Sequence, residues 1–152
     1  MLDDFLIHVF HKGNTLEAYK VFGAHLETND HKKGVRFTVY APNARSVQVV
    51  GDFNDWDGQN HYMERYTDGG IWTLFIPGVK EFALYKYRIE TQNFATVDRA
   101  DPYAFYSELR PGTASRVYNI ERFRWADKKW LNSRTKNFDK PMNIYEVNIG
   151  SW

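Results

Sequence analysis

Short runs of alternating hydrophobic and polar residues dominate the middle of the chain. Turn-forming residues such as Pro42-Asn43, Gly69-Gly70 and Pro77-Gly78 separate the runs. A period of two is typical of strands that bury one face. Because five or more short strands follow one another without a long helix, the pattern predicts an all-β fold, an antiparallel β-sandwich over residues 22–120. The runs are 35–41, 46–50, 71–76, 84–91 and, more weakly, 115–120.

The first 21 residues have a helical pattern instead. Hydrophobic residues fall at helical spacing within residues 3–11, and a second short helical segment is expected over 15–21, with Thr15 as its N-cap. A short amphipathic pair of this kind is not stable alone. We therefore expect residues 1–21 to be an N-terminal helical segment that docks on a larger partner.

The pattern changes again after Ile120. A lysine-rich stretch through Lys140 predicts a short helix or turn followed by a linker. The apolar pattern of the final segment, residues 141–152, then predicts a β-strand with no following partner, as at the start of a further domain. The predicted organisation is a helical segment over 1–21, a sandwich over 22–120, and a linker with the first strand of another domain over 121–152.

Composition excludes several classes of function. The chain of 152 residues has no cysteine, which excludes disulfides, cysteine-ligated metal sites and thiol nucleophiles. Its 20 basic and 19 acidic residues leave a net charge of +1, so no overall field attracts nucleic acid or anionic lipid. No apolar run approaches the roughly 20 residues that span a bilayer, and the acidic N-terminus does not resemble a secretory signal. We expect a cytoplasmic protein without nucleic-acid or membrane partners.

Residues that could carry catalysis are scattered. The aspartates of the predicted turns are expected to cap those turns and face solvent. His8 and His11 lie one helical turn apart but have no third ligand nearby, and Ser151 has no neighbouring histidine. The sequence therefore predicts no cofactor, no metal ion and no self-contained catalytic site. The aspartates concerned are Asp52, Asp55, Asp57, Asp98 and Asp101.

Aromatic residues favour binding instead. The chain has 5 Trp, 10 Tyr and 11 Phe. Trp56 lies among turn-forming polar residues, where its ring either folds back over the edge of the sandwich or stays open to stack on a sugar. Alternation places Lys86 on the face of its strand opposite Tyr85 and Tyr87, and Phe94 lies in a polar turn. Trp72, which heads a strand, is expected to pack in the core or at an interface with a neighbouring domain, together with these two tyrosines and Phe37.

Several stretches, in order, resemble known families. VRFTVYAPNA, VQVVGDFNDWD, GIW, YKYRI and DPYA, which begin at residues 35, 47, 70, 85 and 101, resemble a family 48 carbohydrate-binding module. FGAH, ELRPGTAS and the terminal IYEVNIGSW, which begin at residues 22, 108 and 144, resemble the N-terminal region of bacterial glycogen (1,4-α-glucan) branching enzymes. The likeness covers nearly the whole chain.

This resemblance implies an immunoglobulin-like sandwich that precedes a family 13 (β/α)₈ catalytic barrel, with Ile144–Gly150 as the first strand of that barrel. It implies a parent enzyme that cuts α-1,4-glucan and transfers the released chain to a 6-hydroxyl, with its catalytic residues beyond Trp152. The fragment itself is then non-catalytic, supports the barrel through an intramolecular contact, and binds α-glucan (glycogen or maltooligosaccharide) weakly.

By motif position, the resemblance implies glucan contacts from Trp56, Lys86, Phe94 and Thr113. Phe94 and Ser115 stand where the better binders of the family have tryptophan and asparagine. Three alternatives remain open: a stand-alone glycogen- or starch-binding module, a purely structural domain whose outer aromatics face a neighbour, and the N-terminal part of a debranching or trehalose-releasing relative.

Overall fold

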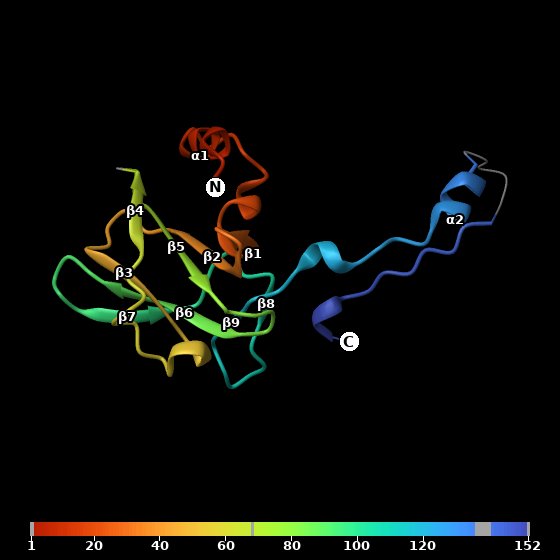
Figure 1. Cartoon of the computed structure of the whole chain (residues 1–152). Coiled ribbons are helices and arrows are strands. Elements are labelled where there is room, and N and C mark those ends of the chain that lie inside the picture. Colours follow the sequence, from red (N-terminus) through yellow and green to blue (C-terminus); the bar gives the residue numbers. More distant parts are fainter. Residues whose placement is uncertain (1, 68, 136–140, 152) are drawn as a thin grey trace. The chain divides into compact units, whose positions relative to one another are not determined.

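The computed structural model describes residues 2–67, 69–135 and 141–151. The chain forms two compact units that divide after Ile120. The first unit carries the strands seen in Figure 1. The elements are α1 (Asp4–His11), η1 (Ala18–Lys20), β1 (Gly23–Asn29), β2 (Lys32–Tyr40), β3 (Ser46–Gly51), η2 (Asp52–Asn54), β4 (Glu64–Thr67), β5 (Ile71–Pro77), β6 (Leu84–Glu90), β7 (Thr96–Arg99), β8 (Tyr106–Ser107), β9 (Ser115–Arg116), η3 (Ile120–Arg122), α2 (Lys128–Ser133) and η4 (Ile149–Ser151).

Two antiparallel sheets make up the first unit. The first has the strand order β1-β2-β5-β4, and the second has the order β3-β6-β9-β8 with β7 also paired to β6. The inner faces of both sheets supply one hydrophobic core. Phe37 of the first sheet and Tyr85 of the second are both fully buried, and their ring centroids are 5.0 Å apart. The predicted all-β antiparallel sandwich is confirmed.

The core contains the aromatic residues that the alternation assigned to it. Phe37, Tyr85 and Tyr87 are at most 1% exposed. Trp72 is also buried, and its indole N–H donates to the carbonyl of Ala41 at 2.9 Å. Because this bond pairs the only polar group of the indole, the ring is buried without an unsatisfied hydrogen-bond donor.

Asp101 contradicts the prediction that the aspartates cap turns at the surface. It is 6% exposed, and its carboxylate accepts hydrogen bonds from the hydroxyls of Tyr85 at 2.7 Å and Tyr87 at 3.1 Å and from the amide of Tyr103 at 2.8 Å. Ser115 is buried as well and accepts from the Asp101 amide. Burial raises the pKa of Asp101, although these hydrogen bonds act in the opposite direction.

The N-terminal helix docks on the sandwich as expected. Asp3 caps α1 by accepting from the amides of Phe5 and Leu6. Ile7 packs with Val21, Phe22 and Ile71 in a second hydrophobic cluster. The second predicted helix, over 15–21, is wrong: only the three residues of η1 are helical, and Thr15 accepts one bond from Glu17. A seven-residue segment gains too few hydrogen bonds to offset helix nucleation.

Four strands, β1, β4, β7 and β8, were not predicted because they lack a regular hydrophobic alternation. They lie at the margins of the sheets, where few of their side chains are buried.

Two predicted strands form only in part or not at all. The predicted run over 115–120 forms only the two residues of β9. The strand expected over 144–150 does not form: residues 141–148 have no regular structure, and η4 follows. A strand needs a neighbour for its hydrogen bonds.

Among the described residues, no helix has the length and the apolar character needed to cross a membrane.

Candidate functional site

The outer face of β6 carries two cationic side chains. Tyr85 and Tyr87 point into the core, so Lys86 and Arg88, which alternate with them, point outward. The prediction that Lys86 lies off the core face is confirmed. Because β6 is flanked by β3, β7 and β9, the two cations lie well inside the second sheet rather than at its edge.

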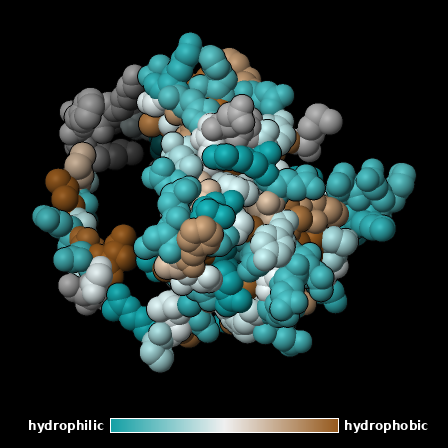
Figure 2. Space-filling view, turned by 90° about the vertical axis from the view of Figure 1, so that its left-hand side faces the viewer, coloured by the Kyte–Doolittle hydropathy of each residue, from teal (hydrophilic) through white to brown (hydrophobic). Residues whose placement is uncertain are grey.

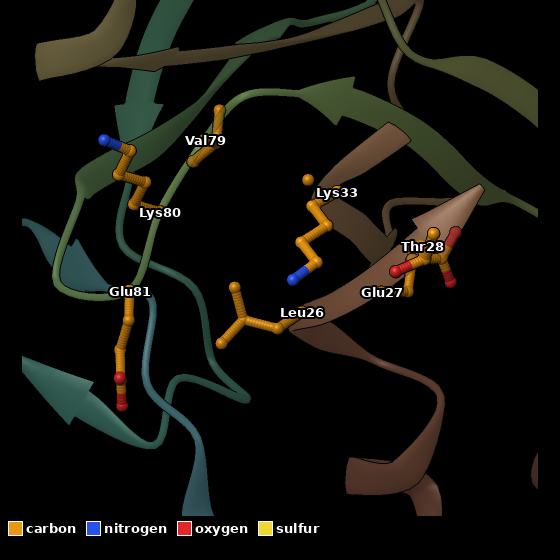
Figure 3. Close-up of a pocket in the computed structure, with 8 residues that line it drawn as sticks. Leu26, Glu27, Thr28, Lys33, Val79, Lys80 and Glu81 are labelled. Carbon is orange, nitrogen blue, oxygen red and sulfur yellow. The ribbon is translucent and has the colours of Figure 1, made fainter. Parts of the chain in front are cut away.

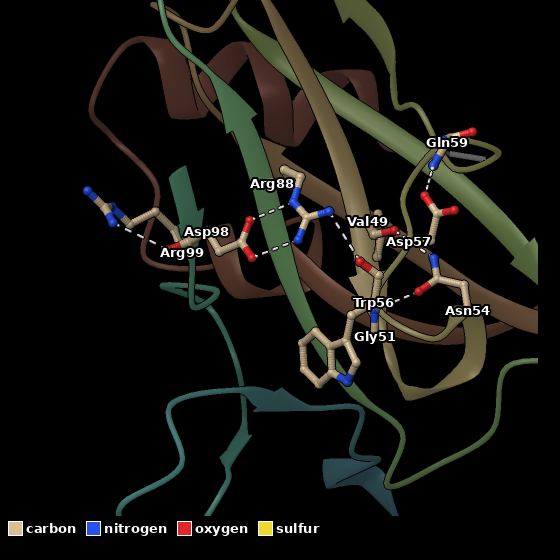
Figure 4. Close-up of polar contacts among 9 residues, drawn as sticks. All are labelled: Val49, Gly51, Asn54, Trp56, Asp57, Gln59, Arg88, Asp98 and Arg99. Atoms are coloured by element: carbon tan, nitrogen blue, oxygen red, sulfur yellow. Dashed lines mark hydrogen bonds and ion pairs between the residues drawn. The ribbon is translucent and has the colours of Figure 1, made fainter. Parts of the chain in front are cut away.

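Trp56 lies beside these cations at the end of the turn that follows β3. Its amide donates to the carbonyl of Gly51 at 2.9 Å, and its carbonyl accepts from the guanidinium of Arg88 at 3.2 Å. Gly51 pairs with Tyr85, the residue before Lys86, and Arg88 follows Lys86 by two residues. The two bonds therefore hold the backbone of Trp56 near this part of β6. Figure 4 shows the indole ring directed away from the polar contacts. The residue is 37% exposed.

The turn that presents Trp56 is held rigidly by its own residues. The side chain of Asn54 accepts from the amide of Gly51 at 2.8 Å and donates to the carbonyl of Val49 at 3.0 Å (Figure 4). A Cβ at Gly51 would lie 2.2 Å from the Leu84 carbonyl oxygen, so only glycine fits there. Asp55 and Trp56 both adopt left-handed backbone, with φ of 52° and 59°. The ring is therefore positioned before any ligand arrives.

Thr113 completes the group of predicted residues that lie together. The ammonium of Lys86 donates to the hydroxyl of Thr113 at 2.8 Å. The loop that carries Thr113 is closed by Glu108, whose amide donates to the carbonyl of Ala114 at 2.9 Å and whose carboxylate accepts from the amide of Ala114 at 3.2 Å. Trp56, Lys86 and Thr113, far apart in sequence, thus lie on one exposed face.

Arg88 and Asp98 also belong to this site, although sequence reasoning did not select them. Arg88 donates two hydrogen bonds to Asp98, at 2.8 and 3.0 Å, in addition to its bond to Trp56 (Figure 4). The hydrogen bonds from the guanidinium lower the pKa of Asp98, so this pair stays ionised. The available signal was the alternation that selected Lys86, because Arg88 shares its face of the strand.

Phe94 is set apart from the other predicted residues. It lies in the turn between β6 and β7, is 67% exposed and has a φ of 63°. The guanidinium of Arg45 lies 3.9 Å from its ring centroid and covers one face of the ring. In Figure 1 this turn is at the far left, whereas η2, which leads to Trp56, is at the lower edge.

The surroundings of this turn are polar. The side of the molecule on the left of Figure 1 faces the viewer in Figure 2, where hydrophilic residues predominate and hydrophobic residues form smaller patches among them. Ser115, which stands at the position of a sugar-binding asparagine in the resembled family, is buried against Asp101 and does not reach this surface. The contact that Phe94 makes with a charged side chain is with Arg45 and not with Lys86.

A cavity of about 360 Å³ lies elsewhere, between the β1–β2 hairpin and the segment after β5. Figure 3 shows Leu26 and Lys33 on one side of it and Val79, Lys80 and Glu81 on the other. None of the four predicted sugar-binding residues lines it. Within the ranges that the structure describes, no three His, Asp or Glu side chains are grouped closely enough to hold a metal ion, and His8 and His11 are no exception.

The sequence of the chain is similar to those of known proteins. Residues 21–104 match the family described as carbohydrate-binding module 48 (isoamylase N-terminal domain). The chain is 47% identical over 148 residues to the 1,4-alpha-glucan branching enzyme GlgB of Bacillus subtilis, a match that covers 96% of this chain and 24% of that protein. The chain thus spans about a quarter of the length of the curated relatives that it matches.

Solved structures agree on the fold. A pullulanase from Bacillus acidopullulyticus is 25% identical, with a TM-score of 0.53 over 66% of this chain and 12% of that one. A putative alpha amylase from Salmonella typhimurium, 21% identical, has a TM-score of 0.55 over 72% of this chain and 16% of that one, and supports the fold alone.

Proposed function

Because the chain belongs to the carbohydrate-binding module 48 family, we propose that it binds α-1,4-glucan on the outer face of its second sheet, through Trp56, Lys86 and Thr113. The observation that carries the proposal is the contact between Lys86 and Thr113 beside an indole ring that its turn holds partly exposed. Phe94 is a further platform at the separate β6–β7 turn.

The chemistry of these groups suits a sugar. The CH face of a pyranose is apolar and stacks on an aromatic ring, while its hydroxyls need hydrogen-bond partners. An ammonium has three donors, and Lys86 uses one of them on Thr113. Two donors remain for sugar hydroxyls, next to the ring of Trp56. A site with one main stacking ring and a few polar contacts gives weak binding, which suits a module that takes hold of a long polymer at many points.

We further propose that the complete protein is a 1,4-α-glucan branching enzyme that acts in the cytoplasm in glycogen synthesis. Support comes from the 47% identity to a branching enzyme over nearly the whole of this chain. In this proposal the chain binds glucan and supports a catalytic domain, while bond cleavage and transfer belong to the remaining three quarters of such an enzyme.

Titration of maltoheptaose into the 152-residue chain tests the binding proposal. Trp56→Ala should weaken binding about five- to tenfold, because a stacked ring contributes about 1 kcal/mol. Thr113→Val keeps the shape of the side chain but removes the partner of Lys86, and should weaken binding about two- to fivefold.

Trp125→Ala is the matched control, because Trp125 is an exposed tryptophan of the other unit. It should bind as the unmodified chain does. Equal dissociation constants for the unmodified chain and for Trp56→Ala would rule the site out. Incubation of the chain with amylose should leave iodine staining unchanged; a fall in staining would show that the chain is catalytic by itself.

A further inference from the structure

A second group of aromatic residues lies near the start of β6 and in the neighbouring β8 and β9 segments. Tyr118 contacts both of its neighbours, with ring-centroid distances of 5.9 Å to Phe82 and 5.5 Å to Tyr106. Phe82 and Tyr106 remain 45% and 46% exposed. We call these three residues the Phe82 cluster. Sequence reasoning did not select any of them.

Strand register places the Phe82 cluster on the same face of the sheet as Lys86. Arg116 of β9 pairs with Leu84 on one side and with Tyr106 on the other, and paired residues share a face. Val117 is fully buried, so Arg116 and Tyr118 point outward. Leu84 precedes Lys86 by two residues on β6 and also points outward. Only a row of partly exposed side chains therefore separates the cluster from Lys86.

The backbone of Phe82 has the same unusual conformation as that of Trp56. Phe82 has a φ of 72°, which is unfavourable for a bulky residue. Phe94 shares the feature, and in the described part of the chain each Phe or Trp with left-handed backbone is exposed. Burial of the ring does not compensate for the strain at Phe82. Strained positions of this kind concentrate where proteins hold ligands.

Charged residues line a cavity beside Phe82. The cavity has a volume of about 370 Å³, and its lining includes Asp52, Lys80 and Glu81. The carboxylate of Asp52 accepts from the amide of Leu84, and that of Glu81 accepts from the amide of Asn119. Asp52 begins η2, the turn that also leads to Trp56. A ring face next to carboxylates and an ammonium suits a sugar better than an apolar protein surface, because each buried charge would need a partner in a dry interface.

We propose that one α-glucan chain crosses the strands of the second sheet, from Trp56 over Lys86 and Thr113 to the Phe82 cluster. Tyr106 and Phe82 form a stacking platform for this chain, in addition to Trp56. Two strand spacings, about 10 Å, separate β6 from β8, a span that a heptasaccharide covers. The inference rests on the proposed function, because it extends the same glucan-binding surface.

Titration followed by NMR of labelled aromatic rings tests this inference. Maltoheptaose added to the 152-residue chain should shift the ring signals of Phe82, Tyr106 and Tyr118 with the same dissociation constant as the indole signal of Trp56. Tyr106→Ala and Phe82→Ala should each weaken the binding that the Trp56 signal reports by about fivefold. Tyr19→Ala, which alters an exposed tyrosine on η1, should have no effect.

Tyr106→Leu guards against loss of fold, because leucine fills the space without offering a ring face. It should weaken binding as Tyr106→Ala does while it keeps the thermal midpoint of the unmodified chain. Shifts confined to the indole of Trp56, or a different dissociation constant at the Phe82 cluster, overturn the inference and leave the proposed function standing. If no signal shifts, both proposals fail.

Discussion

Asp101 is the single residue on which most of the buried polar structure depends. Tyr85 and Tyr87 bury large rings in the core and need an acceptor for their hydroxyls, and the carboxylate of Asp101 accepts from both. Burial raises the pKa of both tyrosines, so their hydroxyls remain donors at any ordinary pH. Asp101 comes 14 residues after Tyr87 in the sequence, and only the fold brings the three together.

Replacement of Asp101 tests this dependence. Asp101→Ala should lower the free energy of unfolding by about 3 kcal/mol, because it removes the carboxylate acceptor of the buried Tyr85 hydroxyl and leaves the Tyr87 hydroxyl only the carbonyl of Thr38, at 3.4 Å. Asp101→Asn retains one acceptor oxygen and should cost less. Urea unfolding at neutral pH gives the comparison, with the exposed Asp57→Asn as the matched control. Equal stability of Asp101→Ala and the unmodified chain would contradict the role of this carboxylate.

The same residue predicts a dependence on pH. Its pKa is raised in the folded state above the ordinary value of 3.8, so the folded protein binds the proton more tightly than the unfolded chain. Its contribution to stability is therefore greatest below pH 3.8 and falls as the pH rises through the window between that value and the raised pKa. The difference in stability between Asp101→Asn and the unmodified chain should change across this window and stay constant above it.

Among the elements, the hairpin between β1 and β2 is the clearest case of a turn set by backbone conformation. Asn29 pairs with Lys32, so Asp30 and His31 form a two-residue turn. Both have positive φ, of 46° and 63°, as the turns that match the twist of antiparallel strands require. Aspartate tolerates this conformation well, whereas glycine is favoured at the second position.

His31→Gly should therefore stabilise the chain slightly. Relief of the left-handed strain contributes about 1–2 kcal/mol, and the greater freedom of glycine in the unfolded chain costs about 0.5–1 kcal/mol. The expected net gain is about 0.5 kcal/mol in the free energy of unfolding, measured by urea denaturation. His31→Ala removes the same ring but keeps the Cβ, so it should not gain stability. A loss of stability in His31→Gly would mean that the imidazole contributes more than the strain it causes.

At the scale of the whole molecule, the two units differ in how they treat their hydrophobic residues. Among the described residues, the buried hydrophobic side chains all lie within residues 7–117, most of them in two clusters. The first unit also exposes large apolar side chains such as Leu16 and Leu109, but the second unit has many exposed ones and no buried one among its described residues. Exposed groups of this kind mark a surface for another protein domain. This difference supports the proposal that the second unit contacts a neighbouring domain while the sandwich binds sugar. The exposed side chains are Phe123, Trp125, Trp130, Leu131, Met142, Ile144, Tyr145, Val147 and Ile149.

A chain that ends at Ile120 tests this division. Both hydrophobic clusters draw only on residues up to Val117, so the free energy of unfolding should change by less than about 0.5 kcal/mol. Self-association, measured by light scattering at high concentration, should decrease because the exposed apolar side chains are gone. A clean monomer for the 152-residue chain under the same conditions would count against a docking role for the second unit.

The limits of the sequence pattern follow from what each element buries. The runs at 35–41, 46–50, 71–76 and 84–91 predicted their strands because one face of each is in the core. β7 left no such signal because three of its four side chains are exposed. For the site, the same alternation placed Lys86 correctly, and family motifs pointed to Trp56 and Thr113. Arg88, Asp98 and the Phe82 cluster were missed, because their roles depend on neighbours in space rather than in sequence.

The sequence by itself therefore determined the all-β class, the main core strands and the outward direction of Lys86, because a period of two decides which side chains leave the core. Only the tertiary structure decided that Thr113 binds Lys86, that Arg45 covers Phe94, and that Asp101 is buried beneath two tyrosines. Those contacts depend on strand order and register, and a local pattern carries no information about which distant residues become neighbours.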